Sequence, residues 1–203
     1  MMYMKLFLVR HAASTRARLG IWGSLFDAPL EDGFEDQLAE TKSALASIQD
    51  PKVFSSPLSR CRETTAYIYP HADVRIVEEF RAYHSGIFEG KTEAFVREQC
   101  PHYMDLSYRE RFLRPRFEEE SVDAQAGRVG KGLVKVLREG SQTSMVVAHY
   151  STINIIAHIS SLNWNKGTYA DGVYDLKEGA FINVTIDPVA VMTGLQYGTG
   201  EKK

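Results

Sequence analysis

Several features that assign a protein to a class at first sight are scarce in this sequence. Only two cysteines occur among 203 residues, and the formal net charge at neutral pH is −2. A net charge this small gives no general attraction to nucleic acid or to an anionic membrane, so any basic site has to be local. Cys61 and Cys100 have no partners at metal-ligand spacing, and we expect two reduced thiols rather than a disulfide.

Long apolar runs are missing as well. The first apolar run, Leu6–Val9, ends at Arg10, and no segment approaches the roughly 18 uninterrupted apolar residues that a membrane-spanning helix needs. These absences predict a cytoplasmic protein that has no membrane partner. Internal repeats, low-complexity blocks and linkers rich in Pro, Gly and Ser are also missing, so we expect residues 1–203 to form a single domain.

What the sequence does contain is an alternation of short apolar segments with amphipathic ones. A short apolar run without Gly or Pro is typical of a buried strand, and apolar residues at a period near 3.6 are typical of a helix. Ser56 followed by Pro57 is typical of a helix N-cap with proline at the first helical position. The alternation predicts an α/β protein, with strands at 6–9, 51–54, 73–80 and 144–148 and helices at 36–48, after Ser56 and at 128–138.

Four basic side chains follow the ends of predicted strands. Arg10 and His11 come after the first strand, Arg60 comes shortly after the second, and His149 comes directly after the strand at 144–148. In open α/β sheets the ligand site lies outside the carboxyl ends of the strands. The planar guanidinium fork matches phosphate oxygens. A lone histidine at such a position is more often structural, but the four together predict a phosphate site.

The motifs that contain these residues resemble those of the histidine phosphatase superfamily, also called the phosphoglycerate mutase-like family, in order along almost the whole chain. LVRHAAS is similar to the family's LVRHGES/T, WGSLFDAPLEDGFEDQ to its G-x-x-D-x-PL-T-x-x-G-x-x-Q with Glu31 in the usual Thr place, and SSPLSRCRETTAY to its SSPLxRAxxTA. GIFEG resembles G-x-W-E-G, Glu120-Ser121 resembles GES, and VVAHYS resembles VVSHGG. Several matching motifs in the family's order are a specific signal.

The resemblance implies a fold and a reaction. The implied fold is a three-layer α/β/α sandwich with a mostly parallel central sheet. The implied activity is a metal-independent phosphatase that hydrolyses a small phosphomonoester, or phosphohistidine, through a phosphohistidine intermediate on His11. Arg10, Arg60 and His149 are implied to bind the transferring phosphoryl group, with His149 donating rather than attacking. The implied substrate-binding residues are Ser14, Gly23 and Tyr150.

The same resemblance defines the expected partners. We expect a small phosphorylated substrate, no metal or other cofactor, no nucleic acid, and a monomer or homodimer. In this family, loops determine which substrate is bound. Here the segment 91–119 contains no chemical pattern that identifies a substrate. We expect Tyr83 to line a pocket for an apolar or ring-bearing leaving group. The exposed-loop arginines Arg16 and Arg18 either recruit an acidic substrate or are simply solvated.

One departure from the family pattern concerns the proton donor. In family members that act on alkyl esters, a glutamate four residues before the first glycine of G-x-W-E-G usually protonates the leaving oxygen, and this sequence has Ala82 there. General acid help is worth roughly a hundred- to ten-thousand-fold in rate. The sequence offers four candidate substitutes, although a residue of this kind is more often a solvated surface charge or a loop hydrogen bond: His84, Glu79, Glu89 and Glu120.

Three functions therefore stay open. A phosphatase is favoured because all four members of the phosphate pocket are present. A phospho-ligand-binding protein that has lost turnover is the alternative, because the usual acid is missing at Ala82. A phosphoglycerate mutase is disfavoured, since Ala17 replaces the asparagine with which mutases contact substrate. Ala12 and Ala13 stand where the family usually has Gly and Glu, so the loop is less polar than usual.

Overall fold

The structure is a computed structural model that describes residues 3–162 and 174–198. Within these ranges one sheet has the strand order β3-β2-β4-β1-β5. The four strands β3, β2, β4 and β1 are parallel, and β5 pairs antiparallel with β1 at the edge. The strands are β1 (Met4–Arg10), β2 (Lys52–Ser55), β3 (Val74–Ile76), β4 (Thr143–Ala148) and β5 (Phe181–Ile186).

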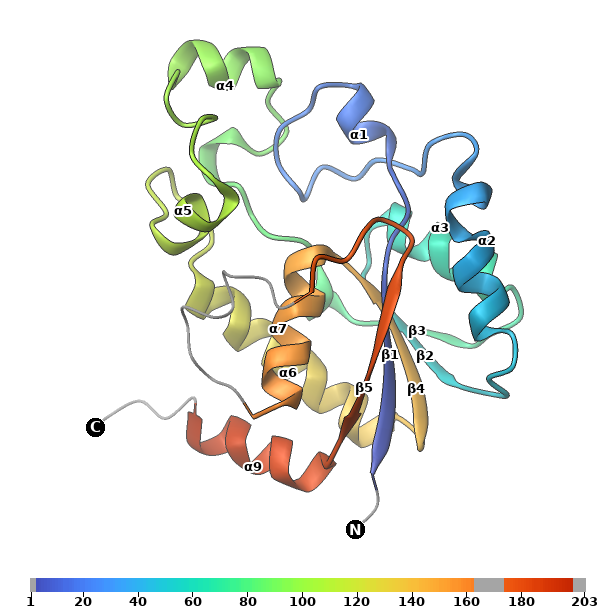
Figure 1. Ribbon diagram of the computed structural model, residues 1–203. Helices are drawn as coiled ribbons and strands as arrows, with labels where there is room; N and C mark the ends of the chain where they lie inside the picture. Colours follow the sequence, from blue (N-terminus) through green and yellow to red (C-terminus); the bar gives the residue numbers. More distant parts are fainter. Residues whose placement is uncertain (1–2, 163–173, 199–203) are drawn as a thin grey trace.

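Helices cover both faces of this sheet, as Figure 1 shows. On one face lie α2 (Phe34–Leu45) and α3 (Ser59–Ile68), and on the other lie α6 (Val122–Glu139), α7 (Tyr150–Ser160) and α9 (Pro188–Gly198). The expected three-layer α/β/α sandwich is therefore confirmed. The short helices α1 (Thr15–Arg18), α4 (Glu93–Gln99) and α5 (Tyr108–Leu113) lie beyond the carboxyl end of the sheet. In the described part of the chain, no helix has the length and apolar character that crossing a membrane requires.

The first apolar run supplies both halves of the core. Because successive side chains of a strand point to opposite faces, Leu6 and Leu8 belong to the cluster under α6 and α7, whereas Phe7 and Val9 belong to the cluster under α2 and α3. A strand buried on both faces has no polar alternation. Arg10, at the end of this buried run, is therefore the first residue after it with a polar side chain.

The start of α3 corrects the expected N-cap. Leu58 rather than Ser56 is the N-cap, and α3 begins at Ser59. The N–H of Ser56 still donates to Val147 O of β4 at 2.9 Å, so the chain stays extended beside the sheet for longer than expected. The carboxylate of Asp27 takes over the capping, because it accepts from both N and Oγ of Ser59, at 2.7 and 3.0 Å. A side chain from a distant loop thus satisfies this helix end.

Other boundaries also differ from the expected ones. The helix expected at 36–48 is α2 (Phe34–Leu45), and the strand expected at 51–54 is β2 (Lys52–Ser55). The strand expected at 73–80 ends at Ile76, and 3₁₀ helix η1 (Glu78–Phe80) follows, with the Phe80 side chain fully buried in the core. The helix expected at 128–138 already begins at Val122, since Ser121 Oγ accepts from Ala124 N at 3.1 Å. The edge strand β5 was not expected. Cys61 and Cys100 are both free thiols.

Candidate active site

Two neighbouring strands deliver the two histidines to one place. In the parallel pair β1 and β4, Arg10 is in register with Ala148, so His11 and His149 follow at the same carboxyl end of the sheet. The N–H of His11 donates to Ala148 O at 3.1 Å. The two imidazole rings lie edge to face, with centroids 5.1 Å apart and planes at 63°. The expected convergence at the strand ends is therefore present in the structure.

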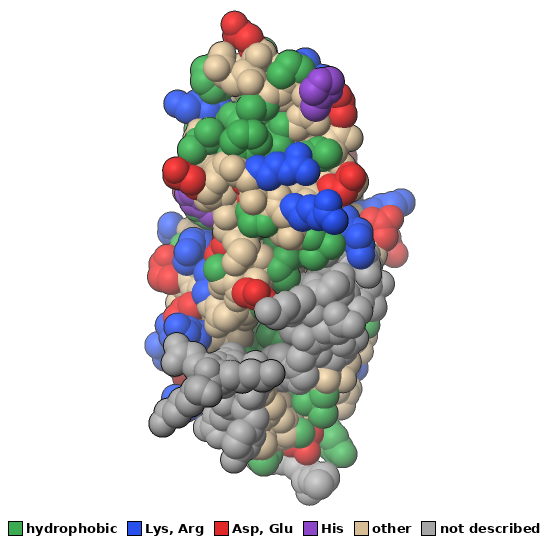
Figure 2. Space-filling view, turned by 90° about the vertical axis from the view of Figure 1, so that its left-hand side faces the viewer, with side chains coloured by type: hydrophobic (Ala, Val, Ile, Leu, Met, Phe, Trp, Pro, Cys, Tyr) green, Lys and Arg blue, Asp and Glu red, His purple; other side chains and the backbone are tan. Residues whose placement is uncertain are grey.

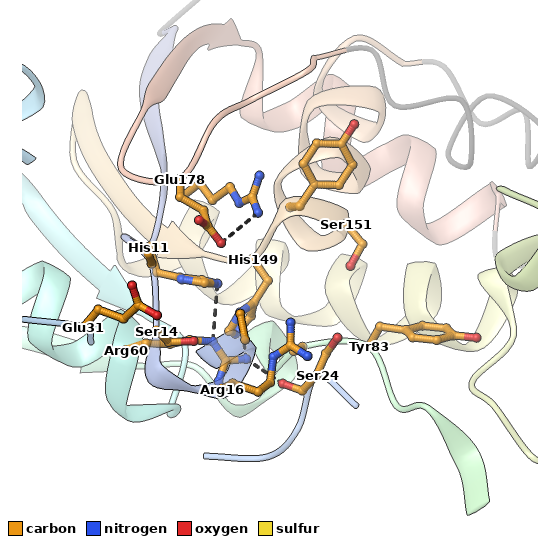
Figure 3. A pocket seen from close by; sticks show the side chains of 15 residues that line it. His11, Ser14, Arg16, Ser24, Glu31, Arg60, Tyr83, His149, Ser151 and Glu178 are labelled. Carbon is orange, nitrogen blue, oxygen red and sulfur yellow. Dashed lines mark hydrogen bonds and ion pairs between the residues drawn. The ribbon is translucent and has the colours of Figure 1, made fainter. Parts of the chain in front are cut away.

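Arg60 lies between the two imidazoles. It is the second residue of α3 and is 2% exposed. Its Nε donates to His11 Nε2 at 3.3 Å, and its Nη2 lies 3.4 Å from His149 Nδ1 (Figure 3). The same guanidinium donates to Phe26 O at 3.1 Å and to Ser24 O at 2.5 Å. These two loop carbonyls hold the cation in place, so its remaining donors point at the histidines.

Arg10 lies on another side of His11. Its Nη1 donates to Leu176 O at 2.6 Å and its Nη2 pairs with Glu178 at 3.3 Å. Its guanidinium carbon lies 5.3 Å from the centroid of the Tyr150 ring. Figure 3 shows Glu178 across His11 from Arg60. Two cations thus flank the nucleophile candidate from different directions, as a phosphate with three free oxygens requires.

A pocket of about 310 Å³ opens over these residues. Its lining includes His11, His149, both arginines and, among the expected substrate-binding residues, Ser14 and Tyr150. Gly23 does not line it. Its φ is +97°, and a Cβ at this position would lie 2.9 Å from Glu89 Cα, so a close backbone approach explains the glycine.

Burial keeps both histidines neutral. The pKa of His11 falls to about 3, first because the ring is desolvated and second because Arg60 is close. His11 Nδ1 lies 2.7 Å from Ala12 O, which assigns the proton to Nδ1 and the lone pair to Nε2. Burial, followed by the neighbouring His11 and Arg60, also holds the pKa of His149 well below its usual value.

His149 has partners for both ring nitrogens. Since Arg60 donates toward Nδ1, the ring proton lies on Nε2 and is donated to Ser56 Oγ at 2.9 Å. The Sγ atom of the buried Cys61 lies 3.6 Å from the same Nε2. Ser56, expected as a helix cap, instead orients the second histidine. The sequence contained no signal for this contact.

The three glutamates named as substitute acids are engaged elsewhere. Glu89 accepts from the backbone N–H groups of three loop residues, at 2.8 to 2.9 Å. Glu120 forms a bidentate pair with Arg128, at 2.6 and 2.7 Å, and Glu79 pairs with Lys135 at 2.6 Å. Among the described residues that line the pocket, none of these three glutamates is present. The structure therefore does not bring them to the reacting group.

Position 82, where the family usually has its acid, lies at the pocket, but the candidate acid His84 does not. Ala82 is one of the lining residues, whereas His84 is not and accepts a hydrogen bond from Gly86 N at 2.9 Å through Nδ1. The carboxylates that do line the pocket are Glu31 and Glu178. Glu178 precedes the unexpected edge strand β5 and carried no motif, so the sequence could not nominate it.

Ser151 is a further lining residue that sequence reasoning missed. It lies in the first turn of α7, is 8% exposed, and accepts a hydrogen bond from Gln125 Nε2 at 2.8 Å. Figure 3 places it on the pocket side of α7, between His149 and Tyr83. In the residues that the structure describes, no three His, Cys, Asp or Glu side chains are grouped to hold a metal ion.

Solved structures of other proteins share this fold. The native structure of mycobacterial glucosyl-3-phosphoglycerate phosphatase has a TM-score of 0.75 at 18% identity and covers 90% of each chain. A putative alpha-ribazole-5'-P phosphatase from Escherichia coli has a TM-score of 0.72 at 18% identity and covers 91% of each chain. Bacillus stearothermophilus YhfR has a TM-score of 0.76 at 16% identity, covering 91% of this chain and 92% of its own. At these identities the likeness establishes the fold.

The sequence comparison with family models assigns the chain more firmly. A search of curated proteins finds no match. The model of the histidine phosphatase superfamily (branch 1), however, matches residues 6–170. The matched range contains both strand ends, with His11 and His149, and the helix that carries Arg60. This chain belongs to the histidine phosphatase superfamily, branch 1.

Proposed function

We propose that this protein is a phosphatase that hydrolyses a small phosphomonoester through a phosphohistidine intermediate on His11. The observation that carries the proposal is the state of the His11 imidazole. It is neutral, its Nδ1–H is held by Ala12 O, and its Nε2 lone pair faces Arg60 in an open pocket. A neutral imidazole with one nitrogen held is a competent nucleophile at the other nitrogen.

The reaction follows from this arrangement in two steps. In the first, His11 Nε2 attacks phosphorus, the Nε2–P bond forms, and the bond from phosphorus to the ester oxygen breaks. In the second, a water oxygen attacks phosphorus, the Nε2–P bond breaks, and inorganic phosphate leaves with the oxygen of the water, so His11 is neutral again. Arg60 now donates to Nε2, and a bound phosphoryl group would offer its oxygens to the same donor. Arg10 and Arg60 together balance the charge of the equatorial oxygens in both steps.

The leaving group has to depart without a carboxylic acid at position 82. The carboxylates nominated from the sequence are held by backbone N–H groups or by ion pairs away from the pocket. We therefore propose a phosphomonoester whose alcohol is acidic enough to leave with little protonation, such as a phenol.

A second candidate function is binding of a phosphorylated ligand without efficient turnover. The alanine at position 82 is the observation that favours it. The four phosphate-pocket residues favour turnover, because a binding protein needs no nucleophile with an assigned lone pair. The cytoplasmic location and the monomeric or homodimeric state expected from the sequence stay predictions.

Phosphate release distinguishes these candidates. The protein should release phosphate from para-nitrophenyl phosphate, and much more slowly from glycerol 2-phosphate, because nitrophenolate leaves without a proton whereas the alkoxide needs one. His11→Ala is the control, and it should release no phosphate above background from either ester. Absence of turnover with the nitrophenyl ester, together with measurable binding of inorganic phosphate, would establish the binding protein instead.

A further inference from the structure

A second cavity of about 250 Å³ adjoins the active pocket. Arg16, Ser24 and Tyr83 line both cavities, so the second one begins where the first one ends. Its remaining lining residues come from the loop after α1, such as Trp22, from Ser85 and Glu93, and from the segment 103–112, such as Tyr103. An alcohol whose phosphate sits over the histidines would extend into this space.

Four aromatic side chains line this cavity: Trp22, Tyr83, Tyr103 and Phe112. Trp22 packs edge to face on Tyr103, with centroids 5.9 Å apart, and Tyr83 packs in the same way on Phe112 at 5.4 Å. Tyr83, Tyr103 and Phe112 are each less than a tenth exposed. The Tyr103 hydroxyl donates to the buried carboxylate of Glu119, which also accepts from two backbone N–H groups. The walls are therefore fixed, and their shape suits a flat ring.

Two guanidinium groups lie among these rings. Arg111 lies 5.0 Å from the Trp22 ring and 5.7 Å from the Tyr103 ring, and its Nη1 donates to Leu106 O at 2.7 Å. Arg16 donates to Ile21 O at 2.8 Å. Within residues 3–162 and 174–198, neither arginine forms an ion pair with a carboxylate.

The charge at this cavity is mixed but positive on balance. Glu93, at the start of α4, also lines it, so two cations face one carboxylate. Figure 2 shows the face that carries α4 and α5, where Lys and Arg side chains lie next to apolar ones in the upper half of the view. A guanidinium stacked on aromatic rings and lacking an anion is a receptor for a carboxylate at the far end of a ring.

We infer that the second cavity binds the leaving group, and that the substrate class is the phosphate monoester of a phenol that carries a carboxylate remote from the ester oxygen. The inference rests on the phosphatase proposed above. Two separate observations lead to it. The aromatic side chains and Arg111 favour an alcohol with a ring and a negative charge, while the alanine at position 82, where the family usually has its acid, favours an alcohol as acidic as a phenol.

A matched series of esters tests the inference. The phosphates of 4-ethylphenol, of 3-(4-hydroxyphenyl)propionate and of tyramine have leaving groups of nearly equal acidity, but carry no charge, a carboxylate and an ammonium group respectively. We expect kcat/KM for the carboxylate ester to exceed that for the ethyl ester by about tenfold or more, mainly through KM, because one charge-assisted contact is worth about that much. The ammonium ester should be no better than the ethyl ester.

Variants of Arg111 test whether this residue causes the preference for the carboxylate ester. Arg111→Gln should reduce the preference for the carboxylate ester over the ethyl ester to under about threefold, and Arg111→Lys should restore part of it. Arg114→Gln is the matched control, since Arg114 is exposed on the same segment and lines neither cavity. Because the preference is also measured in the unaltered protein, a variant that fails to fold leaves the test intact.

The outcomes separate this inference from the proposed function. Hydrolysis of para-nitrophenyl phosphate with no preference for the carboxylate ester keeps the phosphatase and overturns the assignment of the cavity. Calorimetric binding that is tightest for the carboxylate ester, with no turnover of any ester, keeps the assignment of the cavity and overturns the phosphatase. A higher kcat/KM for hexose phosphates than for all three phenol esters overturns the substrate class.

Discussion

Arg60 Nε lies 3.3 Å from His11 Nε2 and donates a hydrogen bond to it. Because a guanidinium has only donors, the acceptor nitrogen must carry a lone pair. The Ala12 carbonyl, 2.7 Å from Nδ1, takes the single ring proton at the other side. The contacts of His11 with Arg60 and Ala12 therefore assign its tautomer, and Nε2 is the atom to which the proposed nucleophilic attack is assigned.

The first prediction concerns the covalent intermediate. During turnover of para-nitrophenyl phosphate, acid-labile phosphate should appear on His11 after rapid quenching. His11→Ala should lower kcat by at least about a thousandfold, because the variant lacks the imidazole that is proposed to attack phosphorus. Label found on His149, or normal turnover by His11→Ala, would show that the roles of the two histidines are wrongly assigned.

The second prediction concerns the guanidinium group of Arg60. Arg60→Ala should reduce kcat/KM for para-nitrophenyl phosphate by about a hundredfold or more, since a fixed cation aimed at the transferring group is worth several kcal/mol in a desolvated site. Arg62→Ala is the matched control, because Arg62 is an exposed arginine of the same helix. A loss below about threefold in Arg60→Ala would remove this residue from the phosphoryl site.

The third prediction concerns stability against pH. The pKa of His11 is about 3 in the folded protein and near 6.5 when unfolded. Below pH 6.5 the unfolded chain binds a proton at this ring that the folded chain does not bind, so the free energy of unfolding falls as the pH falls toward 3. Each such imidazole, His149 included, contributes a slope of up to about 1.4 kcal/mol per pH unit.

Urea denaturation at several pH values between 7.5 and 4.5, in buffers without phosphate, measures this slope. His11→Gln should have a shallower slope than the unaltered protein, because one of the two pocket imidazoles with a lowered pKa is gone. His71→Gln is the control, since His71 is exposed. Equal slopes in His11→Gln and the unaltered protein would mean that His11 is not held neutral by the fold.

The fourth prediction concerns the missing acid. Ala82→Glu places a carboxyl group at the pocket, and should raise the rate with glycerol 2-phosphate by about tenfold or more while changing the rate with para-nitrophenyl phosphate little. Ala17→Glu is the matched control, because it adds a carboxylate elsewhere in the same lining. Equal gains in both variants would attribute the effect to charge alone rather than to proton donation.

The fifth prediction concerns Gly23, which lies against Glu89 and lines the second cavity rather than the first. A Cβ there would lie 2.3 Å from Glu89 Oε1 and 2.9 Å from Glu89 Cα, at a φ of +97°. Gly23→Ala should therefore lower the free energy of unfolding by about 1–3 kcal/mol more than Gly20→Ala. Gly20 also has a positive φ, but a Cβ there meets nothing within 4 Å.

Activity adds a second measurement for Gly23→Ala. Glu89 holds the loop whose carbonyls at Ser24 and Phe26 orient Arg60. Displacing Glu89 should lower kcat/KM as well as stability. Equal losses of stability in Gly23→Ala and Gly20→Ala would contradict the close contact.

Local patterns were sufficient to locate the four phosphate-pocket residues. The apolar run before Arg10 and the one before His149 predict buried strands, and both strands are present with ends in register. A strand that is buried on both faces contains no alternating polar residues. The first polar residue after each apolar run therefore has to lie where the strand ends. The sequence by itself therefore determined which two histidines meet at the carboxyl end of the sheet, and these are the residues to which the proposed phosphoryl transfer is assigned.

Tertiary structure decided how these residues are held. Asp27 caps α3 in place of the expected Ser56, and Ser56 hydrogen-bonds His149 instead. Glu178 reaches Arg10 from a loop 168 residues away, ahead of an edge strand that the sequence did not indicate. Such contacts depend on the path of loops, and a loop has no periodicity from which its path can be inferred.

The path of the loops also explains why the glutamates expected as general acids do not line the pocket. Glu89 and Glu120 have the residue type of a general acid, but their oxygens are occupied by loop N–H groups and by Arg128, respectively. Residue type and spacing determined which chemistry this protein has available. Only the folded chain decided which charged groups face the pocket, because that depends on which partners satisfy each buried polar atom.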